Sequence, residues 1–276
     1  MALVVNTNMN ALQIENTLTG TNNQVSSSLQ KLSSGLRINS AKDNPAGYAI
    51  ANSFKASIAA MQVASQNAGE AQSMLQTADG AYTQINNILV QMKSLATEAA
   101  SGQTNQTDLT GEFKALQAEI DTIANSTQYG TQKLIDGNSI ESSGITFQVG
   151  ATNASNNQMV IKFNGATATN LGVSSGTVGI SSLACAQAAM TALDTALTSI
   201  NAYQGDVGAF QNQLSYTVNN LTTSIQNATA SQSTIEDVDM ASEVSKLTKN
   251  QILQQSAMAM LAQANAQPQA ILKLLQ

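Results

Sequence analysis

The chain has 276 residues, enough for one or two domains and a sizeable core, yet only 4% of them are aromatic and none is Trp. So few large side chains argue against a compact globular enzyme and favour a slender helical bundle, whose narrow core Ala, Leu, Ile and Met can fill. Charged residues make up only 10% of the chain, the net charge is −6 and there is no basic cluster, which argues against nucleic-acid binding. No apolar run approaches the roughly 18 residues of a membrane-spanning helix, so we expect no membrane span.

The first predicted element is an N-terminal helix. Its apolar residues are spaced by four, three and four positions, which puts on one face Val25, Leu29, Leu32 and Leu36. Gly35 is expected to end this helix. Asn44 precedes Pro45, and proline favours the first helical position while the residue before it avoids helical backbone. We therefore predict a domain boundary near residue 44.

The next helix carries the clearest heptad pattern of the chain. Its apolar positions alternate steps of four and three over four heptads, as in a left-handed coiled coil. These positions are Ala71, Leu75, Ala78, Tyr82, Ile85, Leu89, Met92, Ala96 and Ala99. Upstream, the same apolar face is expected to continue with some drift through Ile50, Phe54, Ile58, Met61 and Ala68. A further helix is predicted over about 111–125, and Gly130 is expected to end the turn that follows it.

The middle of the chain, residues 138–182, is rich in Gly, Ser and Thr. Residues 145–149 and 159–163 alternate apolar and polar side chains around a segment of Gly, Asn and Ser, which predicts a β-hairpin. The segment is too short for an independent domain, so we expect it to pack on the helices. Cys185, the single cysteine, lies just beyond it and is expected to be a small buried residue.

The C-terminal arm is predicted to form one continuous helix of roughly 50 residues, whose apolar positions run from Leu193 to Ala228. Acidic residues in 233–239 indicate a helix start and a boundary near 234. The predicted fold is mainly α: a long antiparallel helical bundle, or coiled-coil rod, with a short β-hairpin excursion. Residues 1–44 and 235–276 form a terminal coiled coil, 45–137 and 183–234 form the rod, and the hairpin excursion packs on it. The two terminal helices are too small to be stable alone, so we expect them to be disordered in the free monomer.

Several motifs carry a resemblance to a known family. The stretch Leu32–Gly47 reads Leu-Ser-Ser-Gly-Leu-Arg-Ile-Asn-Ser-Ala-Lys-Asp-Asn-Pro-Ala-Gly, and residues 127–137 and 233–243 carry further matches. Together with the tail from Ala264, these motifs resemble both ends of bacterial flagellins over about four-fifths of the chain. The resemblance implies a filament whose central channel is lined by the two terminal helices. It also implies a minimal member without outer domains.

The resemblance, combined with the apolar pattern, selects the residues of a subunit interface. The terminal unit has only two helices, so its apolar side chains are expected to be buried between subunits of the filament. The predicted inner-core interface consists of Leu3, Val4, Val5, Leu29, Leu32, Leu36, Leu261, Ile271, Leu272, Leu274 and Leu275. The rare charged residues within the signature are predicted to make contacts between the two parts of the chain or with a neighbouring subunit, and they are Arg37, Lys42 and Asp43.

Flagellins are also ligands of a Toll-like receptor, through a patch on the helix that matches residues 88–98 here. Activating members carry two arginines and a glutamate where this chain has Gln91, Lys93 and Ser94, while Leu95 is retained. An arginine that makes two parallel hydrogen bonds is not replaced by Lys or Gln without loss. The resemblance therefore implies weak or absent receptor activation.

The remaining expectations concern function class and partners. The chain contains no His, no Cys/His metal spacing and no Gly-rich phosphate loop, so we expect no enzyme activity, cofactor or metal. The N-terminus has no basic segment followed by an apolar one, and the resemblance implies flagellar type III export, without a cleaved signal peptide, to the extracellular filament. Implied partners are further copies of the chain, an export chaperone, and hook-associated and cap proteins. The alternatives are a hook–filament junction protein and a soluble coiled-coil binding protein.

Overall fold

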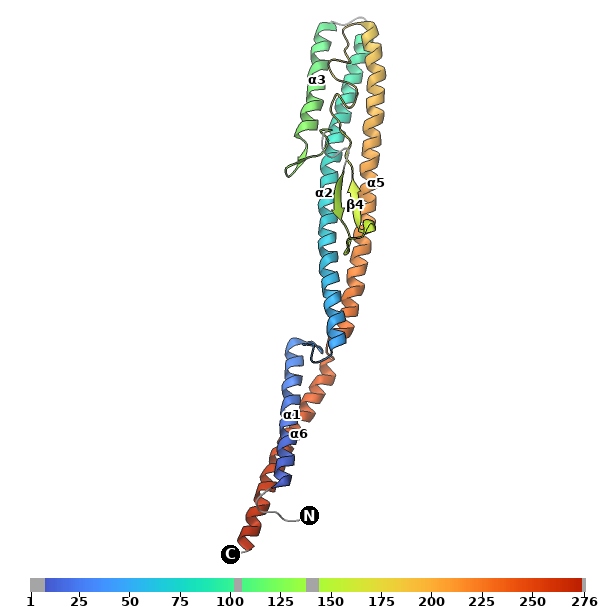
Figure 1. Ribbon diagram of the computed structural model, residues 1–276. Helices are drawn as coiled ribbons and strands as arrows, with labels where there is room; N and C mark the ends of the chain where they lie inside the picture. The colour runs from blue at the N-terminus through green and yellow to red at the C-terminus, as the bar shows by residue number, and fades with distance from the viewer. Residues whose placement is uncertain (1–7, 102–105, 138–143, 275–276) are drawn as a thin grey trace. The chain divides into compact units, whose positions relative to one another are not determined.

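The computed structural model describes residues 8–101, 106–137 and 144–274 (Figure 1). Long helices dominate it, with two small antiparallel sheets, so the predicted mainly α fold with a short β excursion is confirmed. The chain divides into two compact units. Unit 1 comprises Met1–Ala56 and Asn227–Gln276, and unit 2 comprises Ser57–Gln226.

Unit 1 is built on a pair of helices, α1 (Met9–Ser34) and α6 (Met240–Leu274). The side chain of Asn8 caps the start of α1, and Gly35 ends it with a left-handed φ of 73°, a conformation that glycine adopts without a Cβ clash. Side-chain contacts join Asn22 to Gln254 and Ser28 to Glu243, so positions that ascend in α1 meet positions that descend in α6. The two helices are therefore antiparallel.

Unit 2 contains most of α2 (Pro45–Ala100) and of α5 (Leu183–Glu236), together with α3 (Gln106–Ser126). All nine positions of the predicted heptad run are buried, so the run is the core face of α2. The rings of Tyr82 and Tyr203 meet with centroids 5.9 Å apart. The predicted single long C-terminal helix is also confirmed, since α5 spans 54 residues.

The register between α2 and α5 is marked by three polar pairs. Gln204 donates to Thr83, Asn86 donates to Asn201, and Lys93 forms an ion pair with Asp194. Each step of three or seven residues up α2 is matched by an equal step down α5. The helices therefore keep one antiparallel register over this stretch, as regular coiled-coil packing requires.

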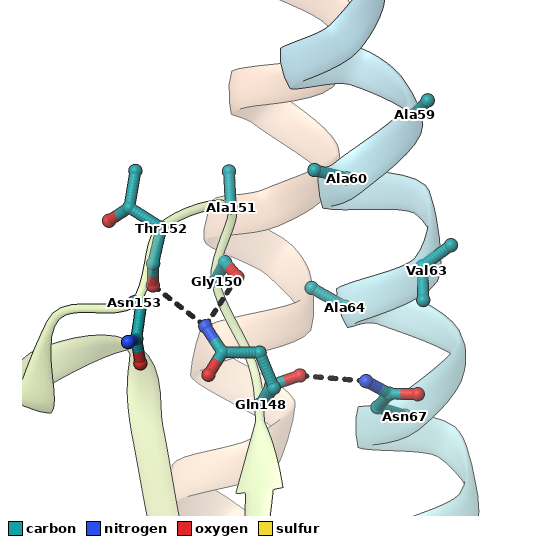
Figure 2. A pocket seen from close by; sticks show the side chains of 10 residues that line it. All are labelled: Ala59, Ala60, Val63, Ala64, Asn67, Gln148, Gly150, Ala151, Thr152 and Asn153. Atoms are coloured by element: carbon teal, nitrogen blue, oxygen red, sulfur yellow. Dashed lines mark hydrogen bonds between the residues drawn. The ribbon is translucent and has the colours of Figure 1, made fainter.

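The middle segment forms the predicted hairpin and also fills part of the core. Strands β3 (Ile145–Gln148) and β4 (Gln158–Ile161) pair antiparallel, with the short helix η1 (Ser155–Asn157) between them. Asn67 of α2 donates to the carbonyl oxygen of Gln148, beside a groove lined mainly by small residues (Figure 2). Beyond the hairpin, the irregular chain buries Phe163, Ala166, Ala168, Leu171, Val173, Val178 and Ile180.

Polar contacts hold this irregular segment in place. The amide of Gln117 in α3 is buried and donates to the carbonyl oxygens of Val173 and Val178 at 2.7 and 2.9 Å. The hydroxyl of Tyr82 donates to the carbonyl oxygen of Asn164. A second small sheet, β1 (Gln128–Tyr129) with β2 (Gln132–Lys133), turns at Gly130, whose φ is 63°. The sequence did not predict this sheet.

Two expectations about individual positions are wrong, and one predicted helix start is displaced by a few residues. Ile50 is exposed because Gly47 and Ala51 occupy the buried face of the first turns of α2. The helix start predicted in the acidic stretch 233–239 lies at the end of that stretch, a few residues beyond the predicted boundary near 234. Helix α5 continues to Glu236, and Asp239 caps α6 by accepting from the backbone nitrogens of residues 241 and 242. Cys185 is exposed, because it lies in the first turn of α5, before the first buried position at Ala186.

Candidate functional site

The α1–α6 pair exposes many large apolar side chains. Leu29 is 50% exposed and Ile252 58% exposed, and both are long enough to bury substantial area against a partner. In α1 the other exposed large apolar residues are Met9 and Leu12, and in α6 they are Met240, Val244, Leu253, Met258 and Met260. An amphipathic pair in a monomer would turn such residues inward. This pair instead presents them to solvent along both helices.

The predicted interface residues fall into three groups. Leu29 is exposed, whereas Leu32, Leu36 and Leu261 are half-buried. The structure describes only the backbone at Ile271, Leu272 and Leu274, in the last turns of α6. Outside the described residues lie Leu3, Val4, Val5 and Leu275.

What the pair buries is mostly small or polar. Of the described residues of α1, only Thr21 and Ser28 are buried, and α6 buries Glu243 and Ala264. The hydroxyl of Ser28 donates to Oε1 of Glu243 at 2.7 Å, and Lys246 donates to Oε2 at 3.1 Å. The Ser28 hydrogen bond lowers the pKa of the Glu243 carboxyl. Burial opposes that shift, and the nearby Lys246 and Lys31 add to it. The pair is thus held by specific polar contacts and has little apolar core.

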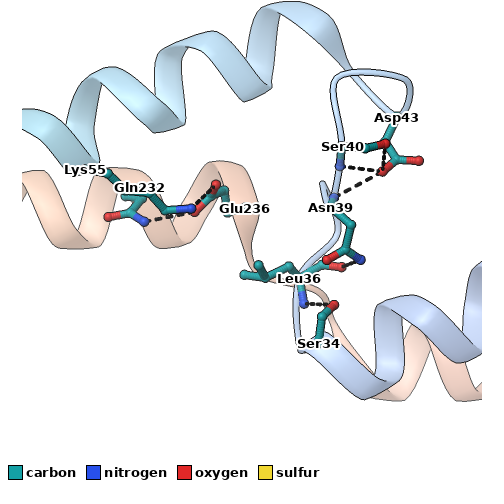
Figure 3. A network of polar contacts seen from close by, with 8 residues as sticks. All are labelled: Ser34, Leu36, Asn39, Ser40, Asp43, Lys55, Gln232 and Glu236. Atoms are coloured by element: carbon teal, nitrogen blue, oxygen red, sulfur yellow. Dashed lines mark hydrogen bonds and ion pairs between the residues drawn. The ribbon is translucent and has the colours of Figure 1, made fainter.

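A second polar cluster surrounds the end of α1 and the end of α5, within unit 1 (Figure 3). The guanidinium of Arg37 donates to the carbonyl oxygens of Thr234 and Ile235, and the backbone nitrogen of Arg37 donates to the carbonyl oxygen of Glu236. These carbonyls lie in the last turn of α5, where no further helical N–H is available to them. Arg37 therefore caps α5.

Asp43 and Lys42 behave differently from Arg37. The Asp43 carboxylate accepts hydrogen bonds from the backbone nitrogens of Asn39 and Ser40 and from the Ser40 hydroxyl. The Asn39 hydrogen bond is the largest cause of a lowered pKa at Asp43. Lys42 is exposed and makes no ion pair among the described residues. Of the three predicted polar residues, only Arg37 reaches the C-terminal arm.

Glu236 belongs to this cluster although the sequence reasoning did not select it. Its side chain is 2% exposed and accepts from Lys55 and Gln232, each at 2.8 Å. Burial raises the pKa of this carboxyl, but the hydrogen bonds from Gln232 and Lys55 and the Lys55 charge outweigh it, so the pKa lies below its ordinary value. The available signal was its place in the 233–243 motif. Its partner Lys55, far away in the sequence, gave none.

The candidate receptor patch lies on α2 in unit 2. Gln91 and Ser94 are exposed, but Lys93 is engaged by Asp194 and Leu95 is buried at 8% exposure. Gln91 donates to the carboxylate of Glu112 in α3 at 3.3 Å. The structure thus brings an acidic residue of α3 to the patch, a contact that spacing in the sequence could not predict.

The described part of the chain contains neither a membrane-spanning helix nor a cluster of metal ligands. None of its helices has the length and hydropathy needed to cross a membrane. Among the same residues, no three His, Cys, Asp or Glu side chains lie together in a way that could hold a metal ion.

Comparison with known proteins bears on both halves of the chain. Family models for the bacterial flagellin N-terminal and C-terminal helical regions match residues 5–140 and 190–275. The chain is 37% identical over 277 residues to flagellin of Halalkalibacterium halodurans, covering 99% of this chain and 100% of that protein. It is 36% identical over 301 residues to flagellin of Bacillus subtilis, covering 98% and 99%.

Among solved structures, a Vibrio parahaemolyticus protein described as flagellar hook-associated aligns with a TM-score of 0.57. The alignment covers 70% of this chain and 99% of that one at 14% identity, which shows similarity of fold alone. The identity of 36% and 37% to two flagellins over nearly the full chain is the stronger finding, because these alignments include both helical ends and the middle segment. The chain therefore belongs to the bacterial flagellin family.

Proposed function

We propose that this chain, a structural subunit of the bacterial flagellar filament and not an enzyme, polymerises through the apolar side chains that α1 and α6 expose. The observation that carries the proposal is the exposure of large apolar residues along both helices, while the pair buries mainly small and polar groups. A concentration of exposed large apolar residues on one pair of helices marks a site of protein association. Further copies of the chain are the partners that supply the missing core.

The expected energetics suit a polymer. Full burial of a Leu, Ile or Met side chain contributes about 1.5–3 kcal/mol, and the α1–α6 pair offers several such groups per copy. Ordering the chains and restricting their motion opposes this gain. Since each contact recurs at every subunit, the loss of a few side chains removes growth without unfolding unit 2.

The test is seeded filament growth, followed by electron microscopy and light scattering. Leu29→Asn and Ile252→Asn, each in the full chain, are expected to stop elongation on native seeds while circular dichroism shows the same helix content. Val160→Asn, which alters an apolar residue 43% exposed on β4, is the matched control and is expected to elongate normally. Normal growth of both α1–α6 variants would overturn the proposal.

The finer parts of the assignment follow from the same family membership. Residues 1–44 and 235–276 would form the inner core of the filament, including the terminal residues Leu3, Val4, Val5, Ile271, Leu272, Leu274 and Leu275. The rod would comprise 45–137 and 183–234. Export without a cleaved signal peptide, an export chaperone, and hook-associated and cap proteins complete the proposal. Electron microscopy of a 45–234 fragment beside the full chain tests the assignment of inner core and rod, since only the full chain should form filaments.

We also propose that this flagellin activates a Toll-like flagellin receptor weakly. The patch lacks both arginines, Lys93 is held by Asp194, and Leu95 is buried. Gln91, Ser94 and the neighbouring Glu112 are exposed to a partner. Gln91→Arg together with Lys93→Arg is expected to raise the response of a receptor reporter cell. A native response equal to that of a strongly activating flagellin would contradict the proposal.

A further inference from the structure

The α1–α6 pair carries a basic pocket whose positive charge is only partly balanced by carboxylates of the same chain. An open pocket of about 300 Å³ is lined by Lys31 of α1 and by Lys246 and Lys249 of α6, together with polar groups that include Ser28. Glu243, which is buried, is the carboxylate in its lining. Three ammonium groups thus surround one carboxylate, and the pocket keeps an excess of positive charge.

The three lysines of the pocket differ in the ion pairs that they form. Lys246 pairs with Glu243, and its side chain is 63% exposed. Lys249 is exposed and makes no ion pair among the described residues, and neither does Lys31. The charge of Lys31 acts on Glu243 and on Asp43, but both carboxylates already accept hydrogen bonds. Lys249 therefore remains free for an external anion.

One carboxylate of unit 1 is correspondingly free. Glu15 is exposed on α1, and its carboxylate has no hydrogen bond or ion pair among the described residues. Every other acidic side chain of unit 1 accepts hydrogen bonds within the chain, namely Asp43, Glu236, Asp237, Asp239 and Glu243. The terminal helix pair thus has an uncommitted negative group at one place and an uncommitted positive pocket at another.

Glu15 lies too far along α1 to reach the pocket of its own chain. Twelve residues separate Glu15 from Ser27 at the pocket wall, which is about 18 Å along a helix. In a second copy that lies alongside the first and is displaced along the helix axis by a similar length, Glu15 would be level with the pocket. Complementary patches at different places on one chain make a head-to-tail contact, which repeats without closing and generates an open filament.

We propose that the Lys31–Lys246–Lys249 pocket receives Glu15 of a second copy of the chain, which sets the axial stagger between neighbouring subunits at about 20 Å. The inference rests on the proposed assembly through α1 and α6. Apolar contacts supply most of the binding, whereas the ion pair selects one stagger among the sliding positions that a smooth apolar surface would permit.

Charge exchange in the full chain tests the pairing. Glu15→Lys and Lys249→Glu are each expected to raise the critical concentration for elongation about fivefold, since each replaces attraction by repulsion at a partly exposed site. The combined Glu15→Lys and Lys249→Glu chain is expected to return to within about twofold of the native value. Glu70→Lys, which makes the same charge change on α2 in unit 2, is the matched control and should leave the value unchanged.

Chemical cross-linking provides a second readout that does not depend on a variant folding. Native filaments grown from mixed ¹⁴N- and ¹⁵N-labelled chains are treated with a carbodiimide, which joins a carboxylate to an amine that it contacts. Mixed-isotope peptides are expected to link Glu15 to Lys31, Lys246 or Lys249. Filaments that grow normally but lack these links, or additive losses in the combined variant, would overturn the pairing alone. Failure of the native chain to elongate would instead count against the proposed function.

Discussion

Glu243 shows how a single buried carboxylate supports the terminal helix pair. Ser28 of α1 and Lys246 of α6 both donate to it, and the resulting pKa lies below the ordinary value of 4.5. A carboxyl whose pKa is lower in the folded state adds stability that is fully present above 4.5 and is lost as the pH falls through the lower, folded-state pKa. Acid should therefore loosen the α1–α6 pair.

The first prediction follows from this linkage. Glu243→Gln keeps an oxygen that can accept from Ser28 but does not titrate, so the variant should be less stable near neutral pH and should lose less stability on acidification. Circular dichroism of the native chain and the variant, from neutral pH to well below 4.5, measures the difference. Asp43→Asn is a useful comparison, because it removes a lowered pKa from a loop that does not join the two helices. Equal acid sensitivity of the native and Glu243→Gln chains would contradict the assignment.

Gly165 shows a different kind of constraint, imposed by backbone proximity. A Cβ atom at this position would lie 2.5 Å from the Cα of Gly137 and 2.2 Å from the side chain of Asn170. Neither contact is possible without a shift, and the first involves backbone. The glycine therefore permits the close approach of two segments in unit 2.

The second prediction is that Gly165→Ala lowers the free energy of unfolding by about 1–3 kcal/mol, the range typical of overpacked sites. Urea denaturation of the monomer measures the loss. Gly176→Ala is the matched control, since a Cβ there meets nothing within 4 Å, and it should be neutral or slightly stabilising. The prediction fails if the two substitutions have equal effects.

At the scale of elements, similar apolar residues are buried in one helix pair and exposed in the other. Leu89 of α2 is fully buried against the rest of the unit 2 core, whereas Leu29 of α1 is half exposed in the monomer. Both belong to periodic apolar stripes. What differs is the number of neighbouring elements, because α3 and the 162–182 segment complete the core of unit 2, whereas no described segment covers α1 and α6 in a comparable way.

The third prediction contrasts these two leucines. Leu89→Ala should reduce the stability of the monomer by about 2–5 kcal/mol, because it leaves a cavity in a packed core. Leu29→Ala should change it by less than about 0.5 kcal/mol, as an exposed substitution does, and yet should impair filament growth. Urea denaturation and seeded growth, measured on the same two proteins, test both halves of the contrast. Large destabilisation by Leu29→Ala would mean that α1 is covered in the monomer.

The helices could be predicted from the sequence because their signals are local. The heptad spacing from Ala71 to Ala99 identifies the buried face of α2, and Gly35 and Pro45 mark helix ends through their own backbone preferences. The core contribution of 162–182 could not be predicted in the same way. Its contacts, such as Gln117 with Val173, join non-periodic segments that are distant in the sequence.

The candidate sites show the same division. The apolar stripe that contains Leu29 is visible as a pattern, and the family motifs single out Arg37 and Asp43. The partners of these residues are not visible: Arg37 reaches carbonyls near Thr234, and Gln91 meets Glu112, only because the helices pair in a particular register. Ile50 was misassigned because an apolar side chain near a helix start need not point inward when Gly47 and Ala51 already fill that face.

At the scale of the whole molecule, the two units should differ in resistance to unfolding. Unit 2 has a continuous apolar core, whereas the described part of unit 1 buries little apolar surface. Segments with few buried apolar contacts open locally at low free-energy cost. The expectation that the terminal helices are disordered in the free monomer stays a prediction, and this difference in burial supports it.

The fourth prediction is that limited proteolysis of the monomer removes α1 and α6 long before it cuts the 57–226 unit. The same sites should be protected in filaments, because neighbouring copies then cover both helices. Mass spectrometry of the fragments identifies the cut positions, and native filaments at the same protein concentration are the control. Equal resistance of both units in the monomer would contradict the prediction.

The Ser28–Glu243 contact has a consequence for the order in which the chain acquires its structure. The two residues are 215 positions apart, and Asn8 and Ala264 are 256 apart. Ribosomes synthesise α1 before α6, so α1 has no partner until the long segment between the two helices has been made. Bringing such distant segments together costs more chain entropy than forming the contacts of unit 2, so this pairing is expected to be the last step of folding. Until then, the apolar side chains of α1 are exposed to solvent, so α1 is the part of a nascent subunit that is most prone to aggregate.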